Sequence, residues 1–156
     1  MALNHLQTLI NDLQQFDYGE ALQTIVADNT QAYEDMQAEQ MAMGKDVNGD
    51  PITLDGNPEY QPATIEHKKR FGQGLGTVTD RVTRYQTGAL YRELFAKVTE
   101  GQVFLSSSVD YWDSLLQRIG SKGTGLDPEM RLRFAEQITI PRFRKMFYEK
   151  TGLVVN

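Results

Sequence analysis

The alternation of hydrophobic and polar positions is clearest in two short segments, residues 94–99 (LFAKVT) and 102–107 (QVFLSS), which flank Glu100-Gly101. Alternation with period two is typical of a strand with one buried face, and a two-residue turn containing glycine is typical of a β-hairpin. A two-residue turn sets the register, and one face then carries the apolar pairs: Val98 faces Val103, Ala96 faces Leu105, and Leu94 faces Ser107. The opposite face, which includes Phe95, Lys97 and Phe104, is expected to meet water or another subunit.

Before this hairpin, the apolar pattern changes to helical spacing. Leucines and an isoleucine recur three or four residues apart and predict a helix over about residues 3–15. The helix is broken at Phe16, and Asp17 with Glu20 is typical of a capping pair at the start of a second helix. An approximate apolar stripe then predicts one long helix over about residues 20–43.

The middle of the chain is rich in turn-forming residues. A loop is expected over residues 44–62, with a short edge segment at 52–54, followed by a helix over 63–71. The glycines at positions 72, 74 and 76 predict a flexible loop, because no strand leads into them as a dinucleotide fingerprint requires. Residues 80–85 alternate and predict a strand, so residues 63–120 form the expected sheet and helix core.

The C-terminal part of the chain predicts helices. Asp110 is expected to cap one helix after the hairpin, and Asp127-Pro128 is a strong start for another. Pro141 is expected to start a last helix, which ends at Gly152, so C-terminal helices cover residues 127–151. The predicted fold is α+β, in a single domain of residues 1–156. It has two N-terminal helices, a small, mostly antiparallel sheet with a central hairpin at about 92–108, and C-terminal helices on the apolar face of that sheet.

Composition and charge argue against several kinds of site and partner for this protein. The 156 residues are 40% hydrophobic and include no cysteine, so disulfides and thiolate zinc sites are excluded. No apolar run approaches the ~18 residues of a membrane span, and the N-terminus lacks the pattern of a signal peptide, so we expect a protein that is not exported and has no membrane partner. The formal net charge of −5 argues against a sequence-specific nucleic-acid partner.

The charge is unevenly distributed along the chain. Residues 1–60 hold eleven acidic side chains and one basic side chain, whereas residues 61–156 hold ten acidic and fifteen basic side chains. Two interpretations remain open. The acidic helices pack on basic parts of the same subunit, or unlike patches meet between neighbouring subunits.

The order of several short motifs resembles a known family. Thr87-Gly88-Ala89-Leu90 precedes the hairpin, its second strand ends in serines, and Tyr111-Trp112 opens a helix. Upstream, residues 44–72 (GKDVNGDPITLDGNPEYQPATIEHKKRFG) include a glycine-and-aspartate loop, a Tyr-x-x-x-Thr segment and a following lysine, and residues 140–143 (IPRF) contain a proline. This order, over roughly residues 40–150, resembles the small tail-completion and head–tail joining (neck, virion morphogenesis) proteins of tailed bacteriophages, whose last helix opens at such a proline segment.

The resemblance implies a structural virion protein in the neck or tail-completion ring between head and tail, found in the virion and in the host cytoplasm during assembly. It implies no enzymatic activity and no cofactor. Its partners would be other copies in a ring and other phage neck, portal-adaptor or tail proteins. A ring needs two unlike patches that meet between neighbours. The basic residues near Pro141 also lie at the unfavourable end of the expected last helix, for which a partner is one reason. The candidate interface therefore consists of Tyr33, Glu34, Asp35, Met36, Glu39, Arg142, Phe143, Arg144 and Lys145.

Two alternatives remain from other classes. Asp110 and Asp113, three residues apart on a helix, are the nearest approach to an acid pair and would serve a phage-encoded hydrolase. A small cytosolic adaptor would instead bind a partner through the acidic helix. Neither His5 nor His67 has an obvious orienting carboxylate in sequence, and Pro51 stands where a calcium loop needs glycine. We therefore assign no catalytic, cofactor-binding or metal-binding residue.

Overall fold

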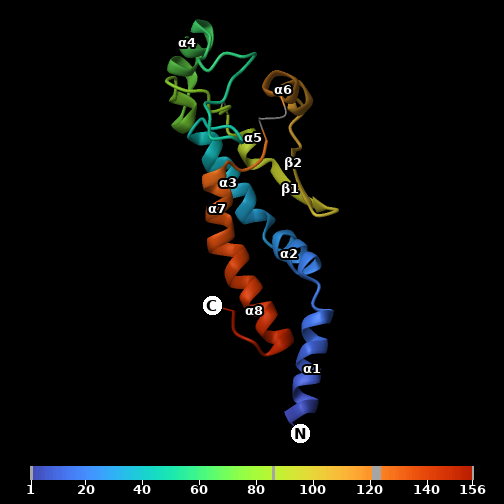
Figure 1. The fold of residues 1–156 in the computed structure, drawn as a ribbon. Coiled ribbons are helices and arrows are strands. Elements are labelled where there is room, and N and C mark those ends of the chain that lie inside the picture. Colours follow the sequence, from blue (N-terminus) through green and yellow to red (C-terminus); the bar gives the residue numbers. More distant parts are fainter. Residues whose placement is uncertain (1, 86, 121–123, 156) are drawn as a thin grey trace.

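The sheet of this α+β protein is a two-stranded antiparallel hairpin of β1 (Leu94–Thr99) and β2 (Gln102–Ser107), and helices lie around and beyond it (Figure 1). The computed structural model describes residues 2–85, 87–120 and 124–155. The predicted register is confirmed, because Leu94 pairs with Ser107, Ala96 with Leu105, and Val98 with Val103. Glu100 and Gly101 have φ values of 52° and 74°, the two positive values that a primed hairpin turn requires.

The N-terminal segment forms α1 (Ala2–Gln15), α2 (Tyr18–Ala27) and α3 (Thr30–Ala42). The first helix and the Asp17 cap are confirmed, since the Asp17 carboxylate accepts a hydrogen bond from the Glu20 amide at 2.8 Å. The single long helix over residues 20–43 was wrong. The buried Asn29 side chain donates to the Ile25 carbonyl at 2.6 Å, and an asparagine that bonds its own backbone competes with helical hydrogen bonds. The chain turns there, so α2 and α3 run in different directions (Figure 1).

The middle of the chain forms α4 (Pro62–Phe71), the 3₁₀ turn η1 (Gly74–Thr77) and α5 (Ala89–Arg92). The helix predicted over 63–71 is confirmed, whereas the glycine loop folds as η1. The strand expected at 80–85 was wrong. Two tyrosine hydroxyls take the place of strand hydrogen bonds at Thr83: Tyr60 accepts from its amide at 2.9 Å, and Tyr91 donates to its carbonyl at 2.6 Å. The segment at 52–54 is likewise no strand, and its neighbourhood forms only isolated bridges, Lys45 with Pro51 and Leu54 with Asn57.

The C-terminal helices are α6 (Trp112–Ile119), α7 (Pro128–Phe134) and α8 (Ile140–Thr151), with a π-helical turn, η3 (Ala135–Thr139), between the last two. The Asp127 cap is confirmed, because its carboxylate accepts from the Met130 amide at 2.8 Å. The Asp110 cap was wrong, since α6 begins at Trp112 and Tyr111 occupies the cap position.

Pro141 does not start a separate helix, because α7, η3 and α8 form one continuous helical segment (Figure 1). A π-helical turn shifts the backbone pairing, which accommodates the N–H that proline lacks. Arg142, Arg144 and Lys145 therefore lie well inside this segment and not in a first turn, so the helix dipole gives no reason to expect a partner there.

The buried hydrophobic residues that the structure describes form three clusters. The first contains Leu94 and Trp112, with Leu105 and Leu115 packed against it. The second joins α3 to α7 through Met36, Met130 and Phe134, together with Leu126. The third joins Phe16 and Ala21 to Phe147 of α8. Of the C-terminal helices that the structure describes, α6 packs with the hairpin as predicted, because Trp112 and Leu115 share a cluster with Leu94 and Leu105. The long α7–α8 segment lies along α3, α2 and α1 instead.

Candidate functional site

The acidic residues of α3 have different roles in the folded chain. The half-buried Glu34 carboxylate accepts a hydrogen bond from the Ala96 amide at 2.7 Å, which links α3 to β1. Glu39 forms an ion pair with Arg133 of α7 at 2.7 Å. Asp35 is exposed and accepts only from Gln31, one turn earlier, at 3.0 Å. Two of the three predicted interface carboxylates therefore stabilise contacts within one subunit.

Tyr33 and Met36, the apolar members of the same predicted patch, belong to the second hydrophobic cluster. The Tyr33 ring meets Phe134 edge-on at a centroid distance of 5.9 Å. Burial raises the pKa of Tyr33, and a backbone hydrogen bond at Leu126 partly opposes that shift. Met36 is buried, so its packing energy holds α3 against α7.

The predicted basic patch lies on α8. Arg142, Arg144 and Lys145 are exposed, and Lys145 makes a long contact of 3.9 Å with Glu149. Phe143 is half-buried, with its ring centroid 5.8 Å from that of Phe16. Among the described residues, no ion pair joins this patch to the acidic residues of α3.

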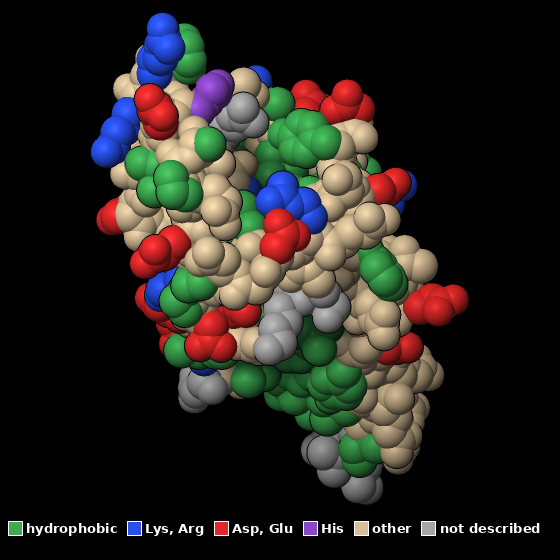
Figure 2. Space-filling model, turned by 90° about the horizontal axis from the view of Figure 1, so that it is seen from above, with side chains coloured by type: hydrophobic (Ala, Val, Ile, Leu, Met, Phe, Trp, Pro, Cys, Tyr) green, Lys and Arg blue, Asp and Glu red, His purple; other side chains and the backbone are tan. Residues whose placement is uncertain are grey.

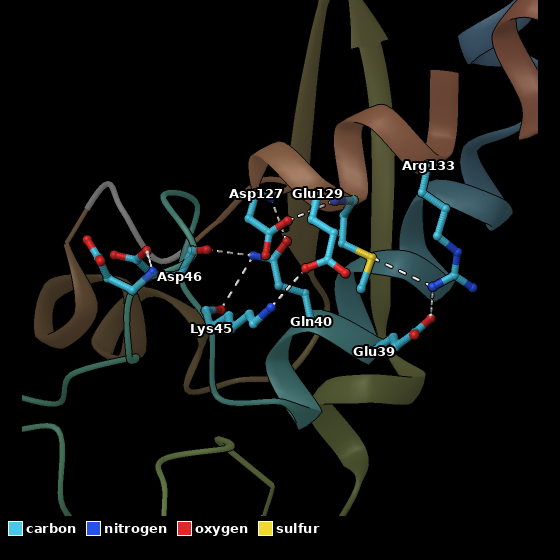
Figure 3. Close-up of polar contacts among 9 residues, drawn as sticks. Glu39, Gln40, Lys45, Asp46, Asp127, Glu129 and Arg133 are labelled. Carbon is cyan, nitrogen blue, oxygen red and sulfur yellow. Dashed lines mark hydrogen bonds and ion pairs between the residues drawn. The ribbon is translucent and has the colours of Figure 1, made fainter. Parts of the chain in front are cut away.

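A polar network that sequence reasoning missed lies between α3 and the start of α7 (Figure 3). The Gln40 side chain is almost fully buried, and its amide nitrogen donates to the carbonyls of Asp46 and Gly125 at 3.1 and 3.0 Å. Its oxygen accepts from the Asp127 amide at 2.6 Å. At the edge of the network, Lys45 and Glu129 form an ion pair at 3.0 Å, and the carboxylate raises the pKa of Lys45.

Exposed hydrophobic side chains gather on what we call the arm, which consists of α1, α2, the α7–α8 segment and residues 152–155. Tyr148 is 54% exposed and Val154 is 74% exposed. The other large exposed hydrophobic residues described on the arm are Ile10, Tyr18, Leu22, Leu132, Ile140 and Val155. Scattered exposed apolar residues are ordinary, but their concentration on one part of a molecule is typical of an interaction surface.

A pocket of about 460 Å³ lies at the opposite end, between α4, the loop at 54–61, residues 84–85 and α6. We call it the basic pocket. Figure 2 looks onto this end of the molecule, where Lys and Arg side chains lie next to hydrophobic ones. Its charged residues are Asp55, Glu59, Lys68, Arg84 and Arg118, and its aromatic residues are Tyr60, Tyr85, Tyr111 and His67. The sequence showed only a short helix with a basic end, because the pocket forms from four separate segments.

The catalytic alternative gains no geometric support from these positions. Asp110 and Asp113 are exposed, and neither lines the basic pocket. The His67 ring is tilted against that of Phe71, with ring centroids 5.0 Å apart, and the His5 side chain lies outside the described residues. In the part of the chain that the structure describes, no three histidine, aspartate or glutamate side chains cluster as metal ligands would. None of the described helices is long and apolar enough to cross a bilayer.

Comparisons with known proteins add no family assignment to these observations. No family model, no curated protein and no solved structure matches the chain.

Proposed function

We propose that the chain is a structural virion protein of a tailed bacteriophage and forms part of the neck or tail-completion ring between head and tail. The order of motifs around the hairpin suggests this role. The observation that carries the proposal beyond resemblance is the arm, whose exposed apolar side chains are suited to burial against another protein.

The helices of the arm are held to one another by a small aromatic cluster. Phe16, between α1 and α2, lies 5.2 Å from Phe147 of α8 between ring centroids, and Tyr18 stacks on Phe143 at 6.1 Å. This cluster fixes α2 against α8 while Tyr18 itself remains half exposed. An interface on the arm would therefore use a surface that is already ordered in the subunit, which lowers the entropic cost of association.

The contacts within the subunit limit which charged residues are available to a neighbouring subunit of the ring. Glu34 and Glu39 are engaged within the chain, so complementarity between subunits would run from exposed Asp35 to the basic patch of Arg142, Arg144 and Lys145. Exposed charges of this kind set orientation and association rate more than affinity. Most of the binding free energy would come from the apolar residues of the arm.

The direct test is localisation in particles of the phage that encodes the chain. Immunoelectron microscopy with an antibody against the chain is expected to label the junction of head and tail. Particles that contain the chain elsewhere, or that assemble fully when its gene is deleted, would rule out the proposed role.

A matched pair of variants tests the arm itself. Tyr148→Ser with Val154→Ser is expected to leave the subunit folded, because both side chains are exposed, but to block neck completion in a complementation assay. Phe71→Ser is the control, since Phe71 is 62% exposed but lies on α4. Equal assembly by both variants would show that the arm is no interface.

The charged contact has its own compensation test. Arg142→Glu with Arg144→Glu is expected to reduce assembly, and adding Asp35→Lys should partly restore it. Asp35 is the suitable partner because changing Glu34 or Glu39 would also break contacts inside the subunit. If Asp35→Lys restored no assembly, the uneven charge distribution would be explained by contacts within one subunit and not by contacts between subunits.

A further inference from the structure

The floor of the basic pocket contains a buried ammonium group. Lys68 is 5% exposed, and its Nζ donates to the carbonyls of Tyr85 at 2.8 Å and Gly76 at 3.3 Å. The same nitrogen lies 4.7 Å from the centroid of the Tyr60 ring. Within residues 2–85, 87–120 and 124–155, no carboxylate lies within ion-pair distance of Lys68.

This arrangement leaves the Lys68 charge incompletely compensated. An ammonium group has three N–H donors, and the two carbonyls account for two of them. Neutral carbonyls and an aromatic face offset only part of the cost of removing a cation from water. An anion in the pocket would supply the missing acceptor and the opposite charge.

A second cation lines the same pocket in an unusual backbone conformation. Arg84 has a φ of 56°, in the left-handed region that non-glycine residues rarely adopt. Asp55, also a lining residue, has a φ of 52°. Such conformations cost free energy and are concentrated at functional sites, where the surrounding structure holds them. Burial lowers the pKa of the Arg84 guanidinium to about 10, so it remains a cation near neutral pH.

The remaining charges of the pocket favour a singly charged anion. Arg118 is held by Asp55 through two hydrogen bonds of 2.9 and 3.1 Å, so these two residues neutralise each other. Glu59 is the other lining carboxylate, and it would repel a dianion such as a phosphate monoester more strongly than a monoanion. Lys68 and Arg84 thus leave this pocket locally positive in a chain whose net charge is −5.

The walls of the pocket are suited to an apolar or aromatic body. Tyr111, which precedes α6, and Leu115 of α6 line it, and so do Tyr60 and Tyr85. A volume of about 460 Å³ is within the range of small-molecule sites. Aromatic rings bind flat apolar groups well because they give a large contact area in defined geometries.

We propose that the basic pocket binds a monocarboxylate carried on an apolar or aromatic body, with the carboxylate at Lys68 and Arg84 and the body between the tyrosines. Such a group could be a free small molecule or the terminal carboxylate of a polypeptide. The proposal does not depend on the virion role, because it concerns the end of the molecule opposite the arm.

The test uses the full chain labelled with ¹⁵N, titrated with 3-phenylpropionate and followed by amide chemical shifts. Saturable shifts are expected at Gly76, Tyr85 and their neighbours, with a Kd on the order of 1 mM for so small a probe. The matching cation, 2-phenylethylamine, is expected to cause no such shifts. Absence of shifts at the pocket, or equal shifts with the amine, would overturn the proposal.

Variants separate the role of the charge from that of the fold. Lys68→Met keeps the length of the side chain and is expected to weaken binding at least about tenfold, whereas Lys69→Met, at the exposed neighbouring position, should leave it unchanged. Arg84→Gly removes the guanidinium at a position where glycine adopts the observed φ without strain, and it should also weaken binding. If Lys68→Met does not fold, the binding of 3-phenylpropionate to Arg84→Gly is the deciding measurement. Full binding by every folded variant would overturn the proposal.

Two further ligands distinguish the sources of the carboxylate. Binding of N-acetyl-Ala-Ala-Phe as the free acid, with loss of binding as the amide, would support capture of a polypeptide end. Binding of 3-phenylpropionate alone would support a small-molecule ligand.

Discussion

Asp127 donates its backbone N–H to Oε1 of Gln40 at 2.6 Å, although 87 positions separate the two residues in sequence. The same Gln40 side chain holds the carbonyls of Asp46 and Gly125, so one amide joins α3, the following loop and the start of α7 (Figure 3). Asp127 in turn caps α7 through its carboxylate. One buried glutamine therefore helps to position the long C-terminal helix, alongside the Glu39–Arg133 ion pair and the packing of Met36.

Gln40→Leu is expected to lower the free energy of unfolding by at least about 2 kcal/mol, because buried donors and acceptors would lose their partners. Urea denaturation monitored by circular dichroism measures this change. Gln31→Leu is the control, since Gln31 is an exposed residue of the same helix and bonds only to Asp35. Similar effects of both substitutions would show that the network contributes little to stability.

Leu105→Asp tests the two faces of the hairpin. Leu105 packs against the first hydrophobic cluster, so a carboxylate there is expected to cost roughly 2 kcal/mol or more. Phe104 is the larger neighbouring residue, but it is 53% exposed on the opposite face, and Phe104→Asp should cost much less. Thermal unfolding of the two variants gives the comparison, and the reverse order of stability would contradict the observed register.

Gly72→Ala tests the close approach of α4 and η1. A Cβ at Gly72 would collide with the backbone carbonyl oxygens of Gly76 and Lys68, and backbone atoms cannot move aside cheaply. We expect a loss of at least about 1 kcal/mol in the free energy of unfolding. Because the Gly76 carbonyl also accepts from Lys68, the variant should bind 3-phenylpropionate more weakly as well.

Gly19→Ala is the matched control for this substitution. Gly19 lies in the first turn of α2, where the nearest neighbour of an added Cβ would be an Asp17 carboxylate oxygen at 3.3 Å. Alanine favours helix, so stability should change little or increase. A larger loss at Gly19 than at Gly72 would contradict the packing described for η1.

The features that the sequence determined by itself are those whose causes lie within a few residues. The hairpin register follows from the alternation of side chains and from Glu100-Gly101, which adopts the two positive φ values of the turn. The starts of α2 and α7 follow from Asp17 and Asp127, whose carboxylates each accept from an amide three positions later. Local geometry decides these contacts, so they can be predicted from neighbouring residues.

Other features depended on partners that are distant in the sequence. Thr83 looked like part of a strand, but the hydroxyls of Tyr60 and Tyr91 satisfy its backbone instead. Nothing in the sequence distinguishes Gln40 from the other polar residues of α3, yet it is buried against residues that only tertiary folding brings near. Periodicity cannot identify such partners, because it records which face of an element is apolar and not what that face meets.

The candidate sites, too, have features that the sequence indicated and features that only the tertiary structure decided. The acidic and basic patches could be read from composition, but only tertiary structure showed that Glu34 bonds to Ala96 and that Glu39 pairs with Arg133. The basic pocket has no sequence signature, since Lys68 and Arg84 come from segments that are individually unremarkable in pattern. Their common burial arises where four segments meet, and desolvation of a charge is a property of that three-dimensional environment rather than of the residue or its neighbours in the chain.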